Sequence, residues 1–206
     1  MRYLKFKNSL KEYTVFSLND IRKIDSNFRR RQLNEWQDKG YIRKIVKGYY
    51  IFSDRAVNED TLYRIANKIY RPSYVSLEIA LSHYSLIPES VYSVTSVSTK
   101  RTYNFSTPVG GFTYRTLKPE LFFGYHIVRK NDDTPYKIAA PEKALLDYLY
   151  LNPHYDTLKD YRELRISSEM FWESIEEKKL LSYVEKFGQK KLKYRVEKLL
   201  RYLKND

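Results

Sequence analysis

The chain has 206 residues, with 38 Lys and Arg against 25 Asp and Glu, so its formal net charge is +13. With 206 residues, 42 % of them hydrophobic, the chain can bury one large core or two small ones. Its content of only 6 Gly and 7 Pro argues against long disordered segments. The absence of cysteine excludes disulfides and thiolate zinc sites. The N-terminus lacks a signal-peptide core, and no apolar run approaches the ~18 residues of a membrane span. We therefore expect a soluble cytoplasmic protein, without membrane contact, whose basic charge suits nucleic acid or an acidic partner.

The first element predicted is a helix over residues 3–13, with Leu4 and Leu10 directed toward the core. Residues 14–16 (Thr-Val-Phe) form a short extended connection after it. This helix would complete a three-helix module with the two that follow.

A short second helix is predicted after Ser17, which suits an N-cap. Its apolar positions Leu18, Ile21 and Ile24 are spaced like one helical face. Residues 25–27 (Asp-Ser-Asn) are typical of a turn, and each could cap the next helix.

A third helix is predicted to end at Gly40, where glycine takes the left-handed conformation without a side-chain clash. Leu33 and Trp36 lie three residues apart and share a face with Arg29, one turn earlier. We expect Trp36 to be buried between the helices, with the opposite face exposed.

A basic hairpin is predicted next, with strands at residues 41–45 and 49–52 flanking the turn at 46–48. Helix, turn, helix and hairpin is the layout of a winged helix-turn-helix, whose second helix enters the DNA major groove while the hairpin contacts the backbone. We therefore predict a DNA-binding domain over residues 1–55.

The distribution of charge favours this interpretation. Residues 1–55 hold 14 Lys and Arg against 6 Asp and Glu, a net charge of +8, whereas the remainder holds 24 against 19, a net charge of +5. The alternative is that the arginines at 29–31 form only a solvated helix face. The residues that we expect to contact DNA are Arg22, Lys23, Asn27, Arg29, Arg30, Arg31, Asn34, Arg43, Lys44 and Lys47.

Residues 53–58 are polar and irregular, and we place a domain boundary there, so that residues 56–206 form a mixed α/β domain ending in helices. A helix is predicted over 62–69, stopped by Pro72. Another is predicted from its cap Ser76 to Pro88. The apolar faces of these two helices are Leu62, Ile65, Ala66 and Ile69, then Leu77, Ala80, Leu81 and Tyr84.

The stretch from Val91 to Val128 changes to a strand pattern. Strands are predicted over 91–99, 112–117 and 121–128, with a turn at 109–111 and a bend or bulge at Gly124. A loop at 131–133 and one more strand at 136–139 complete this region.

The rest of the chain is predicted to be helical. Pro141 opens a helix over 141–150 that is apolar around most of its circumference and should be central and buried. Helix continues over 168–204 with a break at Gly188, and its last part presents Leu192, Val196, Leu199, Leu200 and Leu203 as one stripe, with Lys190, Lys191, Lys193, Arg195, Lys198 and Arg201 on the other sides. Core packing of this stripe is favoured over membrane binding, whereas Trp172 suits either a core or a partner surface.

Enzymatic chemistry has little support in the sequence. His83, His126 and His154 lack ligand spacing, and serine-nucleophile and phosphate-loop signatures are absent. Glu142, Lys143 and Asp147 could be taken for a nuclease cluster, but Glu142 has a structural explanation as a first-turn acid. We therefore expect no enzyme, catalytic residue, metal or cofactor.

Three segments resemble the AbiEi family of type IV toxin–antitoxin antitoxins, winged-helix regulators of viral defence. They are KGYIRKIVKGYYIF at 39–52, YVSLEIALSHYSLIPESVYSVTSVSTKR at 74–101 and AAPEKALLDYLY at 139–150. The resemblance implies an α+β protein of abortive infection that represses transcription from its own promoter, at inverted repeats in double-stranded DNA. It also implies that residues 56–206 counteract a nucleotidyltransferase-like toxin without a stable complex. Three alternatives stay open: an interaction protein whose basic surface binds the toxin or RNA directly, a stand-alone regulator, or a nuclease fused to this kind of winged domain.

Overall fold

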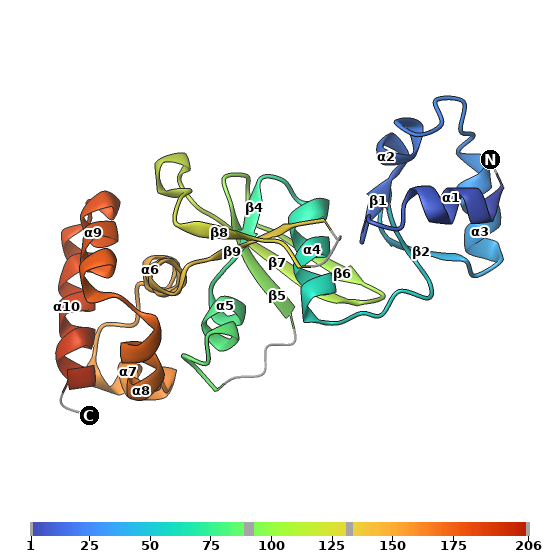
Figure 1. Cartoon of the computed structure of the whole chain (residues 1–206). Coiled ribbons are helices and arrows are strands. Elements are labelled where there is room, and N and C mark those ends of the chain that lie inside the picture. The colour runs from blue at the N-terminus through green and yellow to red at the C-terminus, as the bar shows by residue number, and fades with distance from the viewer. Residues whose placement is uncertain (1, 89–92, 131–133, 205–206) are drawn as a thin grey trace.

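The computed structural model describes residues 2–88, 93–130 and 134–204. It is an α+β fold, as the sequence predicts, and the labels of Figure 1 are used below. In chain order the elements are α1 (Tyr3–Ser9), β1 (Phe16–Ser17), α2 (Leu18–Arg22), α3 (Arg31–Asp38), β2 (Ile42–Val46), β3 (Tyr49–Phe52), α4 (Glu59–Ile69), β4 (Ser73–Val75), α5 (Glu78–His83), β5 (Ser93–Ser98), β6 (Tyr103–Thr107), β7 (Gly110–Thr116), the 3-10 helix η1 (Pro119–Leu121), β8 (Tyr125–Val128), β9 (Tyr136–Ala139), α6 (Pro141–Leu151), α7 (Leu158–Leu164), α8 (Ser168–Ser174), α9 (Glu177–Phe187) and α10 (Lys190–Lys204).

The first two helices are shorter than predicted. Helix α1 buries Phe6, and Leu10 caps its end, whereas Leu4 is 73 % exposed. Leu4 and Leu10 are six residues apart and cannot share a helical face, while Phe6 and Leu10 are four apart and can. In α2, Ile21 is buried, but Ile24 lies beyond the helix end and is exposed.

Helix α3 starts later than the sequence suggests. Residues 25–27 do form a turn, because the Asn27 N–H donates to an Asp25 carboxylate oxygen, but they do not cap α3. Arg30 occupies the N-cap position, so Arg29 lies in the preceding loop and not on the helix. The predicted burial of Leu33 and Trp36 on one face is confirmed, as is the stop at Gly40, which has a φ of +69°.

The hairpin is confirmed as β2 and β3, joined by a turn at 47–48 and paired with β1 in an antiparallel three-stranded sheet of order β1-β3-β2. We call the small hydrophobic cluster on one face of this sheet the N-terminal cluster. Its buried members are Phe6, Leu10, Phe16, Ile21, Phe28, Leu33, Trp36, Ile42, Tyr50 and Phe52.

The other face of the same sheet contributes to a second, larger cluster, which we call the main core. Because side chains alternate along a strand, Tyr50 and Phe52 enter the N-terminal cluster while Ile51 between them enters the main core. Val15 and Ile45 enter the main core in the same way. The small sheet is thus buried on both faces.

The remaining strands form a mixed six-stranded sheet within the described residues, in the order β6-β7-β5-β4-β9-β8. Pairs β5–β7 and β4–β9 are parallel, and the others are antiparallel. The predicted strands at 91–99, 112–117 and 136–139 correspond to β5, β7 and β9, although residues 91–92 lie outside the described residues, as does the predicted loop at 131–133. Strands β4 and β6 were not predicted, and the predicted strand at 121–128 begins only at Tyr125.

Two glycine and turn predictions need adjustment. The turn between β6 and β7 lies at 108–109, so Gly110 already belongs to β7. The bend at Gly124 is confirmed, with a φ of +71°, and a Cβ there would lie 3.1 Å from Cγ of Lys143. Glycine is therefore required at this close approach as well as for the turn.

The predicted cap at Ser76 is wrong. Ser76 is buried and its hydroxyl donates to Asp147 at 2.9 Å, so Leu77 takes the N-cap position of α5 with a φ of +63°. The hydroxyl of Thr95 on β5 accepts from the Ile79 N–H instead. A side chain from the neighbouring strand thus satisfies a helix end that local sequence leaves open.

Helix α6 is central and buried, as predicted, and begins at Pro141. Glu142 contacts the start of α9, where it accepts from the Glu176 N–H at 3.2 Å and pairs with Lys179 at 2.9 Å. Lys143 and Asp147 form an ion pair with no exposed side-chain surface.

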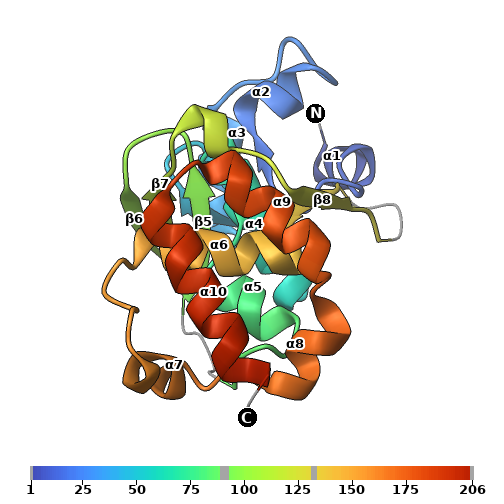
Figure 2. The same ribbon diagram turned by 90° about the vertical axis from the view of Figure 1, so that its left-hand side faces the viewer.

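The C-terminal helices complete the fold. Figure 2 shows α9 and α10 side by side in front of α6, and Figure 1 shows them at the end of the molecule opposite to α3. The apolar stripe of α10 is buried, as predicted, and Gly188 ends α9. Arg195 is not on the solvent side as predicted, because it is 6 % exposed. Helix α7 was not predicted, and Trp172 is 38 % exposed, with its indole N–H directed to the Leu203 carbonyl.

Candidate nucleic-acid interface

The residues that the sequence nominates for DNA contact lie on or beside α2, α3 and the β2–β3 hairpin, in the half of the molecule opposite to α9 and α10 (Figure 1). Helix α3 is held in place because Leu33 and Trp36, on its buried face, pack in the N-terminal cluster. Nine of the ten nominated residues are exposed, namely Arg22, Lys23, Asn27, Arg29, Arg30, Arg31, Asn34, Lys44 and Lys47, and Arg43 is half-buried.

Some of these residues are brought together around an open hollow of about 440 Å³ beside α3. Asn27 and Arg29 approach it from the loop, and Arg31 from the first turn of the helix. Gln32 and Glu35 also line the hollow and were not nominated. Glu35 lies one turn after Arg31 and pairs with it at 3.3 Å across exposed surface, so i, i+4 spacing would have identified it.

The hairpin is held against the rest of the molecule. Val46 and Tyr49, on either side of its turn, pack against the main core, and β2 lies beside β6. A register shift between Lys44 and Val46 interrupts the pairing with β3. Lys44 and Lys47 stay exposed on this supported hairpin, so their amino groups are available to an anionic partner.

Asp20 connects the helix before α3 to the second half of the chain. Its carboxylate accepts from the Ser17 N–H at 2.8 Å and hydroxyl at 2.7 Å, which completes a capping box, and it pairs with Lys68 of α4 at 2.8 Å. Burial alone would raise the pKa of Asp20, but the hydrogen bonds from Lys68 and Ser17 outweigh burial and lower it. The charged form is therefore the one that the fold stabilises.

Asp20→Asn is expected to destabilise the protein by about 1–2 kcal/mol at neutral pH, because it keeps a capping acceptor but loses the charge facing Lys68. A lowered folded-state pKa contributes stability above the unfolded-state pKa, and this contribution is lost as pH falls. The difference between the two proteins should then shrink below a pH of about 4. Urea unfolding from neutral to acid pH measures it, with the exposed Asp38→Asn as control. A difference that grows with acid would contradict the assignment.

The described residues hold no group of three His, Cys, Asp or Glu side chains arranged to bind a metal ion. No helix among them is both long enough and apolar enough to cross a membrane. Of the three side chains weighed as a nuclease cluster, Lys143 and Asp147 are fully buried and Glu142 is 2 % exposed.

No model of a known protein family matches the chain, and no curated protein sequence matches it either.

Proposed function

We propose that this protein is a transcription regulator that binds double-stranded DNA through a winged helix-turn-helix formed by residues 1–55. Helix α3 enters the major groove, and the β2–β3 hairpin contacts the adjacent phosphates. The operator is the protein's own promoter, at inverted repeats, and binding represses transcription. The protein is not an enzyme and needs no cofactor.

One observation carries this proposal. Helix α3 buries Leu33 and Trp36 and leaves Arg31 and Asn34 exposed at one end of the molecule, with Arg30 exposed at its N-cap position. Arginine can contact guanine, and asparagine adenine, through two hydrogen bonds each, which is how helices in the major groove distinguish bases. Exposed Lys44 and Lys47 on the neighbouring hairpin supply charge for the backbone.

We further propose that residues 56–206 antagonise a nucleotidyltransferase-like toxin encoded nearby, without forming a stable complex, in an abortive infection system. This role rests on the resemblance of the segments at 39–52, 74–101 and 139–150 to AbiEi antitoxins. Co-expression of the full chain with the adjacent gene tests it, because an antitoxin restores growth. Co-purification of the two products would instead favour direct toxin binding through the basic surface.

The promoter-binding proposal is tested by gel shift of labelled DNA from immediately upstream of the gene. Each phosphate contact releases condensed counterion, so on the order of five contacts give a log–log salt slope of roughly −4 to −5. A slope near zero, or equal affinity for upstream and random DNA, would refute a promoter-binding regulator. Tighter binding to RNA than to DNA would favour the RNA-binding alternative.

Arg30→Ala and Arg31→Ala are expected to weaken operator binding more than binding to random DNA, by ~1–3 kcal/mol of discrimination, because each removes a base-reading side chain. Lys47→Ala should weaken both alike, because a phosphate contact carries no sequence information. Paired titrations on operator and random duplexes measure this. Lys178→Ala on α9, at the opposite end of the molecule, is the control for the loss of one charge. Equal effects of all three interface variants on both duplexes would show that α3 does not read the bases.

A further inference from the structure

A second hollow, of about 470 Å³, lies between the start of α10 and the chain that follows α6, remote from α3. The residues that line it are Pro153, Asp156, Lys190, Lys191, Tyr194 and Arg195.

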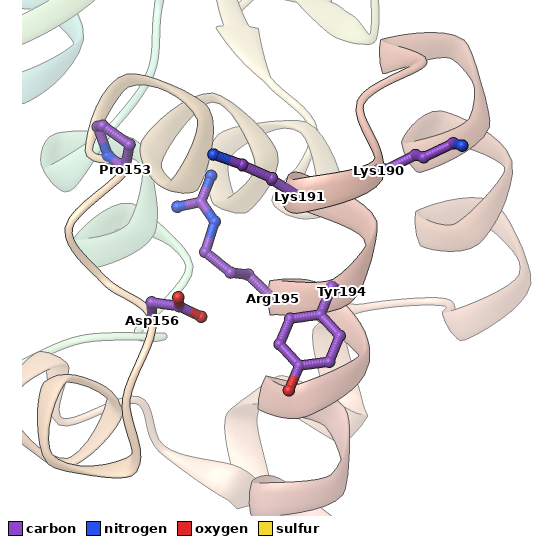
Figure 3. Close-up of a pocket in the computed structure, with 6 residues that line it drawn as sticks. All are labelled: Pro153, Asp156, Lys190, Lys191, Tyr194 and Arg195. Carbon is purple, nitrogen blue, oxygen red and sulfur yellow. The ribbon is translucent and has the colours of Figure 1, made fainter.

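Arg195 provides a fixed cation in the wall of this hollow. Its side chain is held because Nη1 donates to the carbonyls of Leu149 at 2.8 Å and Asn152 at 3.3 Å, at the C-terminal end of α6. Lys191 lies one turn earlier on α10. Figure 3 shows the amino group of Lys191 and the guanidinium of Arg195 extending into the same region, whereas Lys190 points away from them.

Neither of the two converging cations forms an ion pair with a described residue, and the negative charge of Asp156, on the wall of the hollow, acts on Arg195 only at longer range. Among the described residues, no carboxylate lies within 4.0 Å of Lys191 or Arg195, and the only acid lining the hollow, Asp156, pairs with Lys198 at 3.6 Å. Like charges four residues apart on a helix repel. An anion in the hollow would neutralise both cations at once, which makes it the favoured occupant.

The rim of the hollow favours a particular kind of anion. Tyr194 is 54 % exposed, although a large aromatic ring gains by being covered. A guanidinium beside an ammonium suits the several oxygens of a phosphate group. Lys198 Nζ lies over one face of the Tyr194 ring, 5.3 Å from its centroid, so a nucleobase would stack on the other face. A cavity of this size lies within the range of small-ligand sites.

We propose that this hollow binds a nucleotide, with its phosphate between Lys191 and Arg195 and its base on the ring of Tyr194. The nucleotide is either free or the terminal nucleotide of a single-stranded RNA, since the two present the same chemistry. The site is independent of promoter binding, because it lies at the end of the molecule opposite to α3 (Figure 1).

Calorimetric titration of the full chain tests the proposal with AMP, adenosine and inorganic phosphate as probes. AMP should bind, and adenosine should not bind at the same millimolar concentrations. Lys191→Ala should weaken AMP binding at least about tenfold, because it removes one of the two charged contacts. Tyr194→Ala should weaken AMP binding but leave phosphate binding unchanged. Arg195 is left intact because it holds the end of α6.

The matched control is Lys178→Ala, which removes one exposed charge from α9 outside the hollow and should change nothing. Equal losses of AMP affinity from Lys178→Ala and Lys191→Ala would overturn the proposal in favour of a diffuse positive field, as would a failure of AMP to bind.

RNA oligonucleotides with and without a 5′-phosphate distinguish the source of the nucleotide. If the phosphorylated strand binds more tightly than AMP, and Lys191→Ala and Tyr194→Ala weaken that binding, the site takes the end of an RNA strand. If the two bind with equal affinity, the site takes free nucleotides. Promoter binding by Lys191→Ala should be unchanged, which separates failure here from failure of the proposed regulator.

Discussion

Replacing Trp36 with alanine should unfold the N-terminal cluster, although Trp36 is not among the side chains that we propose to contact DNA. The Trp36 ring lies 4.3 Å from that of Phe6, 5.5 Å from that of Phe28 and 5.7 Å from that of Tyr3, measured between centroids, and only 6 % of the residue is exposed. Truncation of such a residue costs ~3–5 kcal/mol, because it leaves a cavity among side chains that cannot close around it. Urea unfolding followed by tyrosine and tryptophan fluorescence measures the loss.

Trp36→Phe is the matched control, because it keeps an aromatic ring in the cluster and should retain most of the stability. If Trp36→Ala abolished DNA binding with an unchanged unfolding transition, the ring would contact the partner and not the core. The same experiment distinguishes residues that hold α3 in place from residues proposed to contact bases, since Arg31→Ala is expected to leave the free energy of unfolding unchanged.

The second large effect is expected from Lys143→Met. Lys143 and Asp147 are both fully buried, and the pair is surrounded by the rings of Phe123, Phe187 and Tyr74. Burial lowers the pKa of Lys143 and raises that of Asp147, so each charge depends on the other. Loss of the cation leaves an uncompensated buried carboxylate, which costs about 3–5 kcal/mol. Equilibrium unfolding in urea measures this loss.

A second replacement distinguishes the charge from the volume. Lys143→Met combined with Asp147→Leu removes both charges and should be more stable than Lys143→Met alone. Lys159→Met is the control, because Lys159 faces Glu163 with the same i, i+4 spacing on an exposed surface and should matter little. The hydroxyls of Tyr74 and Ser76 donate to Asp147 at 2.8 and 2.9 Å. If the double variant were as unstable as the single one, these hydrogen bonds would be the source of the stability, and not the ion pair.

Elements governed by local rules were predictable from sequence. The N-cap at Ser17, the buried pair Leu33 and Trp36, the stop at Gly40 and the proline start of α6 each follow from residues within one or two turns of each other. The hairpin was predictable for the same reason. Whether the exposed arginines of α3 read DNA is a matter of partner chemistry, and the sequence supplies only the candidates.

The sequence-based predictions were wrong or missing where contacts between residues far apart in the sequence determine the local structure. Strand β4 has three residues and exists because β5 and β9 flank it, which no local pattern reveals. Ser76 is committed to Asp147, 71 residues away, and so cannot cap α5. Arg195 is buried because the free carbonyls at the end of α6 accept its hydrogen bonds. In each case a tertiary contact overrides a sound local expectation.

Under the proposed function, the burial of both faces of the small N-terminal sheet limits how this protein can change its DNA target. A segment spanning residues 1–55, if exchanged between relatives, would carry Val15, Ile45 and Ile51 onto a partner surface that has not been shaped to receive them. The exposed side chains of α3 carry no such constraint, because their replacement leaves both clusters intact. Under the proposed function, new operators would therefore be reached by point substitution on α3 more readily than by recombination at the 55/56 junction, and an engineer who wants to redirect the protein should replace side chains and not whole segments.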